Sequence, residues 1–311
     1  MRVATVFGVV ACLLCASLAH AQAPAVGPLV LLLPATPRAA ALGNAWVAGR
    51  DHEVVFYNPA QLVGARGGFD VSVVQTGPSS TMATLGSAYA AGKWSLTFGW
   101  GVQAVTFSTD AAGPYPYTRD SLLSSGSADG FSSLFVVGGA IVVKGFRVGA
   151  AGKYALESTP PMADTAAGMP GNQSAFVADI GVARNLWGGT IAGSVQNLGG
   201  TRDDRAPLEL PRQVLIGYAI AKPAGPLDLA IYSQLTMRHG WTSPGGGLEV
   251  GYSWIEGYNI AFRVGARRPE TSAEFPMAFG VAFTADRLTI EYSLQIFDGG
   301  RTANGVMVRW R

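Results

Sequence analysis

Charged residues are scarce in this chain. Only 14 % of the 311 residues are Asp, Glu, Lys or Arg, against about a quarter in an ordinary soluble domain, although 49 % are apolar. A soluble domain of this length needs a more charged surface, and a disordered chain is far less apolar. The 22 basic and 20 acidic residues nearly cancel, so no nucleic-acid partner is expected. The composition therefore favours neither an ordinary soluble domain nor a disordered chain.

Cysteine is nearly absent, and its position is informative. Cys12 and Cys15 both follow Arg2 within an apolar stretch, and small residues then offer cleavage positions around Ala21. This order is typical of a secretory signal peptide over residues 1–21. A transmembrane anchor and a lipoprotein signal ending at Cys12 are the alternatives. After cleavage at Ala21 the mature chain has no thiol and no disulfide.

Long hydrophobic runs are also missing beyond the signal. No later stretch approaches the roughly 20 apolar residues that cross a bilayer as a helix. An exported, apolar and poorly charged chain can instead span a membrane as a closed β-barrel, whose strands alternate apolar and polar residues. Residues 288–297 alternate in this way, with Leu288, Ile290 and Tyr292 on one face and Glu291 on the other.

Similar alternation predicts an all-β fold, a transmembrane antiparallel barrel of about 14 strands. A soluble β-sandwich is the alternative, but it would carry polar residues where these strands carry Leu, Ile, Tyr and Trp. The expected strands are residues 67–75, 82–91, 93–105, 131–143, 145–157, 174–185, 187–198, 211–222, 226–236, 247–254, 258–267, 275–283, 288–297 and 301–311.

The connections between these segments alternate between long and short. Long ones are expected at residues 106–130, 158–173, 199–210, 237–246 and 268–274. This rhythm is typical of an outer-membrane barrel with short periplasmic turns, and an even strand number places both termini in the periplasm. In the last strand Gly305, Val308 and Trp310 have a spacing similar to the C-terminal signal that the barrel-assembly machinery reads, with Arg311 after the aromatic.

The segment before the first strand carries a family resemblance. Ala-Leu-Gly at residues 41–43 precedes Tyr-Asn-Pro-Ala-Gln-Leu at 57–62, and further matches lie at 195–199, 247–252 and 262–265. Together they resemble the long-chain fatty acid transporter superfamily, and most closely its PorV-like branch. The resemblance implies an N-terminal hatch, residues 22–65, inside a barrel formed by residues 66–311. Residues 50–53 are more charged than the usual linker of that superfamily.

Asn58, Pro59 and Ala60 form the part of this hatch expected to lie along a ligand path. Pro59 fixes its own φ and favours an extended Asn58, whose side chain can bond nearby backbone. Barrels of more than eight strands have room for such a segment. The motif predicts a buried turn that either controls a path for an apolar ligand or only fills the lumen.

Signals of catalysis are weak. The mature chain has two histidines, His52 and His239, and neither has a metal-ligand spacing. The one hint of a hydrolytic site is His239 near Ser233 and Asp228. We therefore expect no catalytic residue, cofactor or metal. Charged residues on the predicted lumen face are expected to pair with each other, with selectivity or proton handling as the alternative role; the main candidates are Asp179, Glu249, Arg263 and Glu291.

Two functions follow from the resemblance. The first is passage of a hydrophobic small molecule across the outer membrane, which the apolar loop residues at 115, 117, 122 and 123 also favour. The alternative is a non-transporting interaction barrel of PorV type that holds secreted proteins at the cell surface. Outer-membrane lipids and the barrel-assembly machinery are expected partners in both cases. Pro276, inside its strand, is a candidate site for a kink and a lateral opening.

Overall fold

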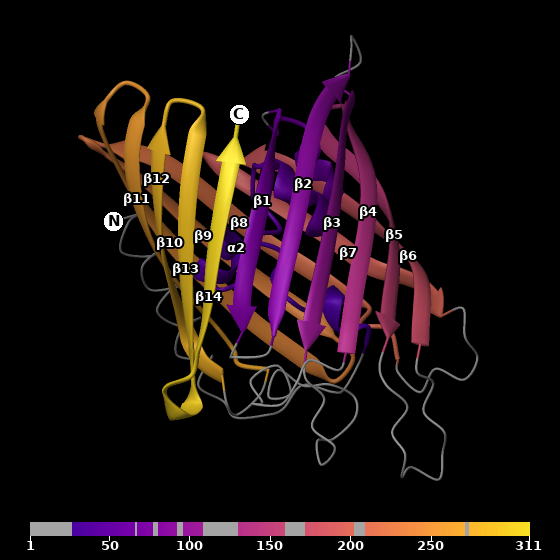
Figure 1. Ribbon diagram of the computed structural model, residues 1–311. Helices are drawn as coiled ribbons and strands as arrows, with labels where there is room; N and C mark the ends of the chain where they lie inside the picture. The colour runs from indigo at the N-terminus through magenta and orange to yellow at the C-terminus, as the bar shows by residue number, and fades with distance from the viewer. Residues whose placement is uncertain are drawn as a thin grey trace.

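The protein is a closed barrel of fourteen antiparallel strands (Figure 1). The computed structural model describes residues 27–65, 67–76, 80–91, 96–107, 130–158, 172–201, 209–270 and 274–311. The predicted fold class and strand number are confirmed. The strands are β1 (Gly68–Thr76), β2 (Thr81–Ala91), β3 (Leu96–Phe107), β4 (Gly130–Val143), β5 (Phe146–Ser158), β6 (Asn172–Leu186), β7 (Gly189–Thr201), β8 (Gln213–Ala224), β9 (Leu227–Arg238), β10 (Trp241–Ile255), β11 (Tyr258–Arg267), β12 (Glu274–Ala285), β13 (Leu288–Phe297) and β14 (Thr302–Trp310).

The two faces of the wall differ in the way the sequence predicts. In β13, Ile290 and Tyr292 point outward and are exposed, whereas Thr289, Glu291 and Ser293 point inward and are buried. Successive side chains of a strand point to opposite faces, so each strand contacts lipid with one set of side chains and lines the lumen with the other. Lipid replaces water as the outer solvent, and this accounts for the low charge content.

At one end of the barrel, the upper end in Figure 1, where the C-terminus lies, two-residue turns join β4 to β5, β6 to β7, β8 to β9, β10 to β11 and β12 to β13. Lys144 and Gly145 have φ of 50° and 80° there, as the right-handed twist of a hairpin requires. The C-terminal end of β14 pairs with the start of β1, Trp310 opposite Phe69, so the barrel begins and ends at this same end.

One expected loop, residues 237–246, is wrong. Only His239 and Gly240 separate β9 from β10, which begins at Trp241. Gly245 and Gly246 fall within that expected loop, yet they lie in β10, where the segment inside the lumen approaches the wall closely. A Cβ on Gly245 would come within 2.8 Å of the Gly43 carbonyl oxygen.

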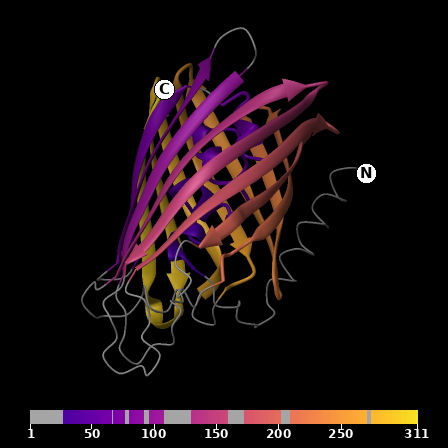
Figure 2. The ribbon, with the colours of Figure 1, turned by 90° about the vertical axis from the view of Figure 1, so that its right-hand side faces the viewer.

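Residues 27–65 cross the lumen and include η1 (Leu29–Leu31), α2 (Pro37–Ala41), η2 (His52–Phe56) and η3 (Pro59–Leu62). The segment starts at the end opposite the short turns, where the Gly27 amide donates to the Glu209 carbonyl at 3.2 Å. Figures 1 and 2 show it in indigo inside the barrel. We call residues 27–65 the hatch. The expected signal peptide lies outside the described residues.

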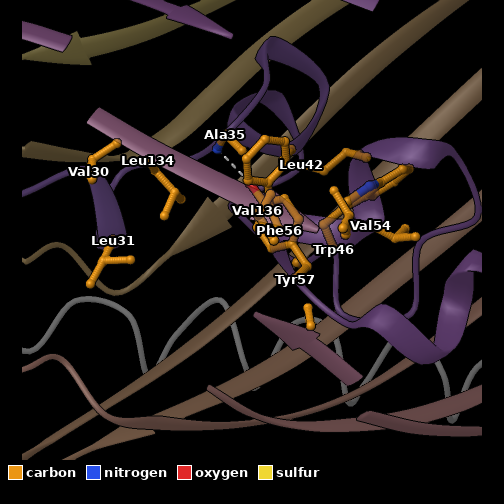
Figure 3. Packing of buried hydrophobic residues seen from close by; sticks show 14 of the residues in the cluster. Val30, Leu31, Ala35, Leu42, Trp46, Val54, Phe56, Tyr57, Leu134 and Val136 are labelled. Carbon is orange, nitrogen blue, oxygen red and sulfur yellow. Dashed lines mark hydrogen bonds between the residues drawn. The ribbon is translucent and has the colours of Figure 1, made fainter. Parts of the chain in front are cut away.

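The main apolar core forms where the hatch meets the wall. Leu42, Trp46 and Val54 are at most 1 % exposed, and Phe56 and Tyr57 pack beside Val136 of β4 (Figure 3). The Tyr57 hydroxyl accepts a 2.8 Å hydrogen bond from the Ala35 amide, which ties two parts of the hatch together. Among the described residues, no helix has the length and apolar character needed to cross a bilayer.

Candidate functional site

Asn58 is the best-anchored residue of the hatch. It is fully buried and extended, with φ of −155°, and its Oδ1 accepts from the Ala60 amide at 3.1 Å to cap η3. Its Nδ2 donates to the carbonyls of Val47 at 3.1 Å, Gly193 at 3.3 Å and Val182 at 3.4 Å. One amide thus joins the hatch to itself and to β6 and β7.

Two wall glycines leave the space that this turn occupies. A Cβ on Gly181 of β6 would lie 1.9 Å from Asn58 Oδ1, and a Cβ on Gly149 of β5 would lie 2.5 Å from the Ala60 nitrogen. No Cβ tolerates such distances, so any other residue at either position would displace the hatch or the wall. We call residues 58–60 with these strands the neutral contact.

The charged residues 51–53 lie inside the lumen, where they meet the wall opposite the neutral contact. Asp51 and Glu53 are at most 8 % exposed and accept from Arg309 of β14 at 2.9 and 2.5 Å. His52 pairs with Asp70 of β1. Asp51 also binds Arg311 at 2.8 Å. We call residues 51–53 with these partners the ionic contact.

Three of the four main lumen candidates extend the same network. Arg263 of β11 donates to Glu249 of β10 at 2.5 Å and to Glu291 of β13 at 2.7 Å. Glu249 also accepts from Arg38 of the hatch at 3.0 Å. The fourth candidate, Asp179, lies elsewhere: it pairs with Lys153 at 2.6 Å beside a register shift between β6 and β7.

Burial and neighbouring charge act in opposite directions on the hatch carboxyls. Burial alone would raise the pKa of Asp51, but Arg309, Arg38 and Arg311 outweigh it and hold that pKa well below its usual range. Burial raises the pKa of Glu53 to about 7, because Arg309 offsets only part of the burial and nearby Asp51 opposes a second negative charge. Asp51 is therefore the stronger acid of the two and keeps its negative charge to lower pH than Glu53 does.

The hatch separates two cavities. One, of about 50 Å³, lies on the side of the longer connections, between apolar hatch residues such as Val30 and Leu31 and wall residues such as Leu134 (Figure 3). The amides of Gln103, Gln196, Gln213 and Gln234 also line it. The other, of about 670 Å³, opens at the short-turn end, and Arg50, Tyr232 and Asn259 contribute to its polar wall.

The charges around the smaller cavity are already paired. Its cations are Lys153, which pairs with Asp179, Arg267, which binds Glu274 at 2.5 Å, and Arg238, which lies 3.5 Å from Glu270. Within the described part of the chain, this lining has no charged group without an ion-pair partner. The cavity therefore offers a ligand apolar surface and amide groups rather than an excess charge.

The suggested hydrolytic group is not assembled. Asp228 and His239 lie at opposite ends of β9, about 36 Å apart along the strand at about 3.3 Å per residue, and Ser233 Oγ bonds the Tyr218 carbonyl between them. No group of three His, Cys, Asp or Glu within the described ranges could hold a metal. The apolar loop residues at 115, 117, 122 and 123 lie outside those ranges.

The other predicted positions are distributed over the wall. In β14, Gly305 faces the hatch, whereas Val308 and Trp310 face outward and are exposed. Pro276 lies where the pairing of β12 with β13 shifts register, between Glu274 and Ala278.

Sequence reasoning missed the ionic contact. Arg309 and Asp70 occupy lumen-facing positions of the last and first strands, where a charge needs a partner. The alternation of lumen-facing and outward-facing positions was the signal that could have identified both residues. The partners came from the hatch, and the sequence alone offers no register between the hatch and the wall.

No known family profile matches the sequence, and no curated protein matches it. Among solved structures, the Pseudomonas putida toluene transporter TodX is similar, with a TM-score of 0.56 at 10 % identity, covering 87 % of this chain and 95 % of that one. A TodX variant described as a monoaromatic hydrocarbon channel gives 0.55 at 10 % identity, over 88 % and 98 % of the two chains. A Pseudomonas aeruginosa FadL homologue gives 0.49 at 11 %, over 92 % and 98 %.

At these identities the likeness concerns the fold. The chain has the fold of an outer-membrane β-barrel, like the hydrocarbon channels of the TodX type. The finer resemblance to the PorV-like branch stays a prediction.

Proposed function

We propose that this protein lies in the outer membrane and admits an uncharged, largely apolar small molecule. The observation that carries the proposal is the smaller cavity, which lies between the hatch and the wall strands, at the end of the barrel away from the short turns. The similar TodX structures belong to a toluene transporter, which supports an apolar cargo. We place the short turns, and with them the first residue of β1 and the last residue of β14, on the periplasmic side.

Charge pairing in the lining supports an uncharged ligand over a carboxylate. An anion entering the cavity would have to compete with Glu270 for Arg238, or with Glu274 for Arg267, and would lose its own hydration as well. A neutral molecule would lose less hydration than an anion, although a cavity of about 50 Å³ is smaller than the roughly 150 Å³ that holds benzene and must widen to admit it. Glutamine amides could orient any single polar group of such a ligand.

Equilibrium binding to the purified mature protein tests this function. Toluene and 1-octanol are expected to bind saturably, and octanoate at least about tenfold more weakly, because its charge has no partner. Leu134→Lys adds a charge to the cavity and should abolish toluene binding. Ser253→Lys adds the same charge to the larger cavity at the short-turn end. It is the matched control and should leave toluene binding unchanged.

The opposite outcomes are equally specific. Equal binding of octanoate and toluene would contradict the uncharged ligand class. No saturable binding of any compound, together with a surface protein that co-purifies with the barrel, would favour the PorV-type interaction function.

A further inference from the structure

The junction of β1 with β14 differs from every other strand pair of the barrel. Neighbouring strands elsewhere are consecutive in sequence, whereas β1 and β14 meet only when the ends of the barrel chain come together. Until they pair, both present open edges, and closing so long a loop costs conformational entropy. We call this junction the seam.

Both strands of the seam place a charge in the lumen at the same level. Asp70 of β1 and Arg309 of β14 are direct register partners, and both are 1 % exposed. Buried charges of this kind need partners, because an unpaired ion in a dry interior is strongly destabilising. Arg309 binds carboxylates of the hatch, and Asp70 lies against the imidazole of His52.

Three consecutive hatch residues reach both sides of the seam. His52 contacts Asp70 on β1, while Asp51 and Glu53, on either side of it, bind Arg309 on β14. Asp51 also binds Arg311, the residue that follows the C-terminal aromatic. We propose that residues 51–53 act as an internal staple that holds the seam of the barrel closed.

The staple explains two features that transport does not require. It accounts for the charged residues 51–53 in a segment whose other charged residues are Arg38 and Arg50. It also accounts for an arginine after Trp310, because Arg311 supplies a third cation to Asp51 beside Arg38 and Arg309. The inference uses contacts of the hatch with the wall alone. It therefore holds or fails independently of the ligand.

A cross-link across the seam provides the test. Residues 16–311 contain no cysteine, and Val73 and Val306 are exposed register partners on the outer face. Opposed strand residues have Cα atoms about 4.5–5.5 Å apart, which is compatible with a disulfide. Val73→Cys with Val306→Cys can therefore replace the staple covalently.

The cross-link is placed in the native protein, in Asp51→Asn/His52→Leu and in Lys153→Met. The last variant is the matched control, since it breaks a buried ion pair of β5 and β6 away from the seam. Unfolding temperature is followed by heat-dependent mobility of the folded barrel on gels, under oxidising and reducing conditions. The staple variant should unfold about 10 °C below the native protein when reduced.

The decisive quantity is the gain that the disulfide gives in each background. Oxidation should recover most of the loss in the staple variant and add much less to the native protein and to Lys153→Met. An equal gain in all three, or a staple variant that unfolds like the native protein, would overturn the proposal. If the double variant does not assemble, Asp51→Asn alone is compared in the same way, with a smaller loss and the same selective recovery expected.

Discussion

The hatch is held at two places by different physics. At the neutral contact, Asn58 gives hydrogen bonds to backbone carbonyls and fits a space left by Gly181 and Gly149. At the ionic contact, Asp51 and Glu53 bind Arg309 within a network of buried charges. The first attachment depends on shape and is insensitive to salt and pH, whereas the second depends on charge balance. Only the second attachment reaches the seam.

The largest expected effect comes from Arg309→Met. It removes the cation shared by Asp51, Glu53 and Glu291 and leaves these carboxyls undercompensated, so the free energy of unfolding should fall by about 3–5 kcal/mol. Denaturant unfolding in micelles, followed by tryptophan fluorescence, measures this change.

Arg147→Met is the control for that variant. Arg147 of β5 bonds Asn185 and Thr190, which are neutral, so its loss should cost less than about 1 kcal/mol. Equal losses in both variants would show that the ionic contact has no special weight.

Gly181→Val breaks the neutral contact by filling its space. Its Cβ would overlap Asn58 Oδ1, so the turn must move, at a cost of about 1–3 kcal/mol. Gly152→Val is the matched control, because a Cβ there meets no atom within 4 Å. Proteolysis by trypsin reports the displacement: the hatch should be cut in the first variant and protected in the second. Equal protection of the hatch from trypsin in both variants would contradict the close fit at the neutral contact.

Asn58→Ala tests the hydrogen bonds at the same place without overlap. Loss of the cap on η3 and of the contacts with Val47 and Gly193 should lower the free energy of unfolding by about 1–2 kcal/mol. Asn58→Asp keeps the acceptor for the Ala60 amide but turns an oxygen toward those carbonyls. It should be no more stable than the alanine variant, and a native-like aspartate variant would rule out a role for the Nδ2 contacts.

The smallest effect at neutral pH is expected for Glu53→Gln. The folded pKa of Glu53, about 7, lies above its ordinary value of 4.5, so the folded state binds a proton more tightly than the unfolded state. Stability due to this group is full below pH 4.5 and is lost as pH rises through 7, with a slope of at most about 1.4 kcal/mol per pH unit. Glu53→Gln should flatten the stability profile between pH 5 and 7.5. If the free energy of unfolding of Glu53→Gln changes with pH as steeply as that of the native protein, the pH dependence belongs to another group.

The wall of the barrel was predictable because one rule governs it. Alternation along residues 288–297 and its repeats follows from lipid on one side and the lumen on the other, so strand number and facing could be derived residue by residue. The turn at Asn58 was predictable for a local reason, since Pro59 and the Asn side chain together specify a capped turn.

The contacts of the hatch were not predictable in the same way. Gly245 falls within the expected loop 237–246, and only the approach of Gly43 shows why a glycine belongs at that position of β10. The pairing of Asp51 with Arg309 spans 258 residues, and no local pattern determines which hatch residue meets which strand. The sequence therefore predicts which side chains face the lumen and are polar, but not which of them pair with each other.

The central claim is that residues 27–65 form a fixed part of the barrel interior, anchored at both contacts. Hydrogen exchange of the native protein in membranes, resolved by mass spectrometry, tests it most directly. We predict that amides of residues 46–61 exchange as slowly as those of β14, because both are buried and bonded to the same structure. Exchange of residues 46–61 within seconds, while β14 stays protected, would contradict an anchored hatch.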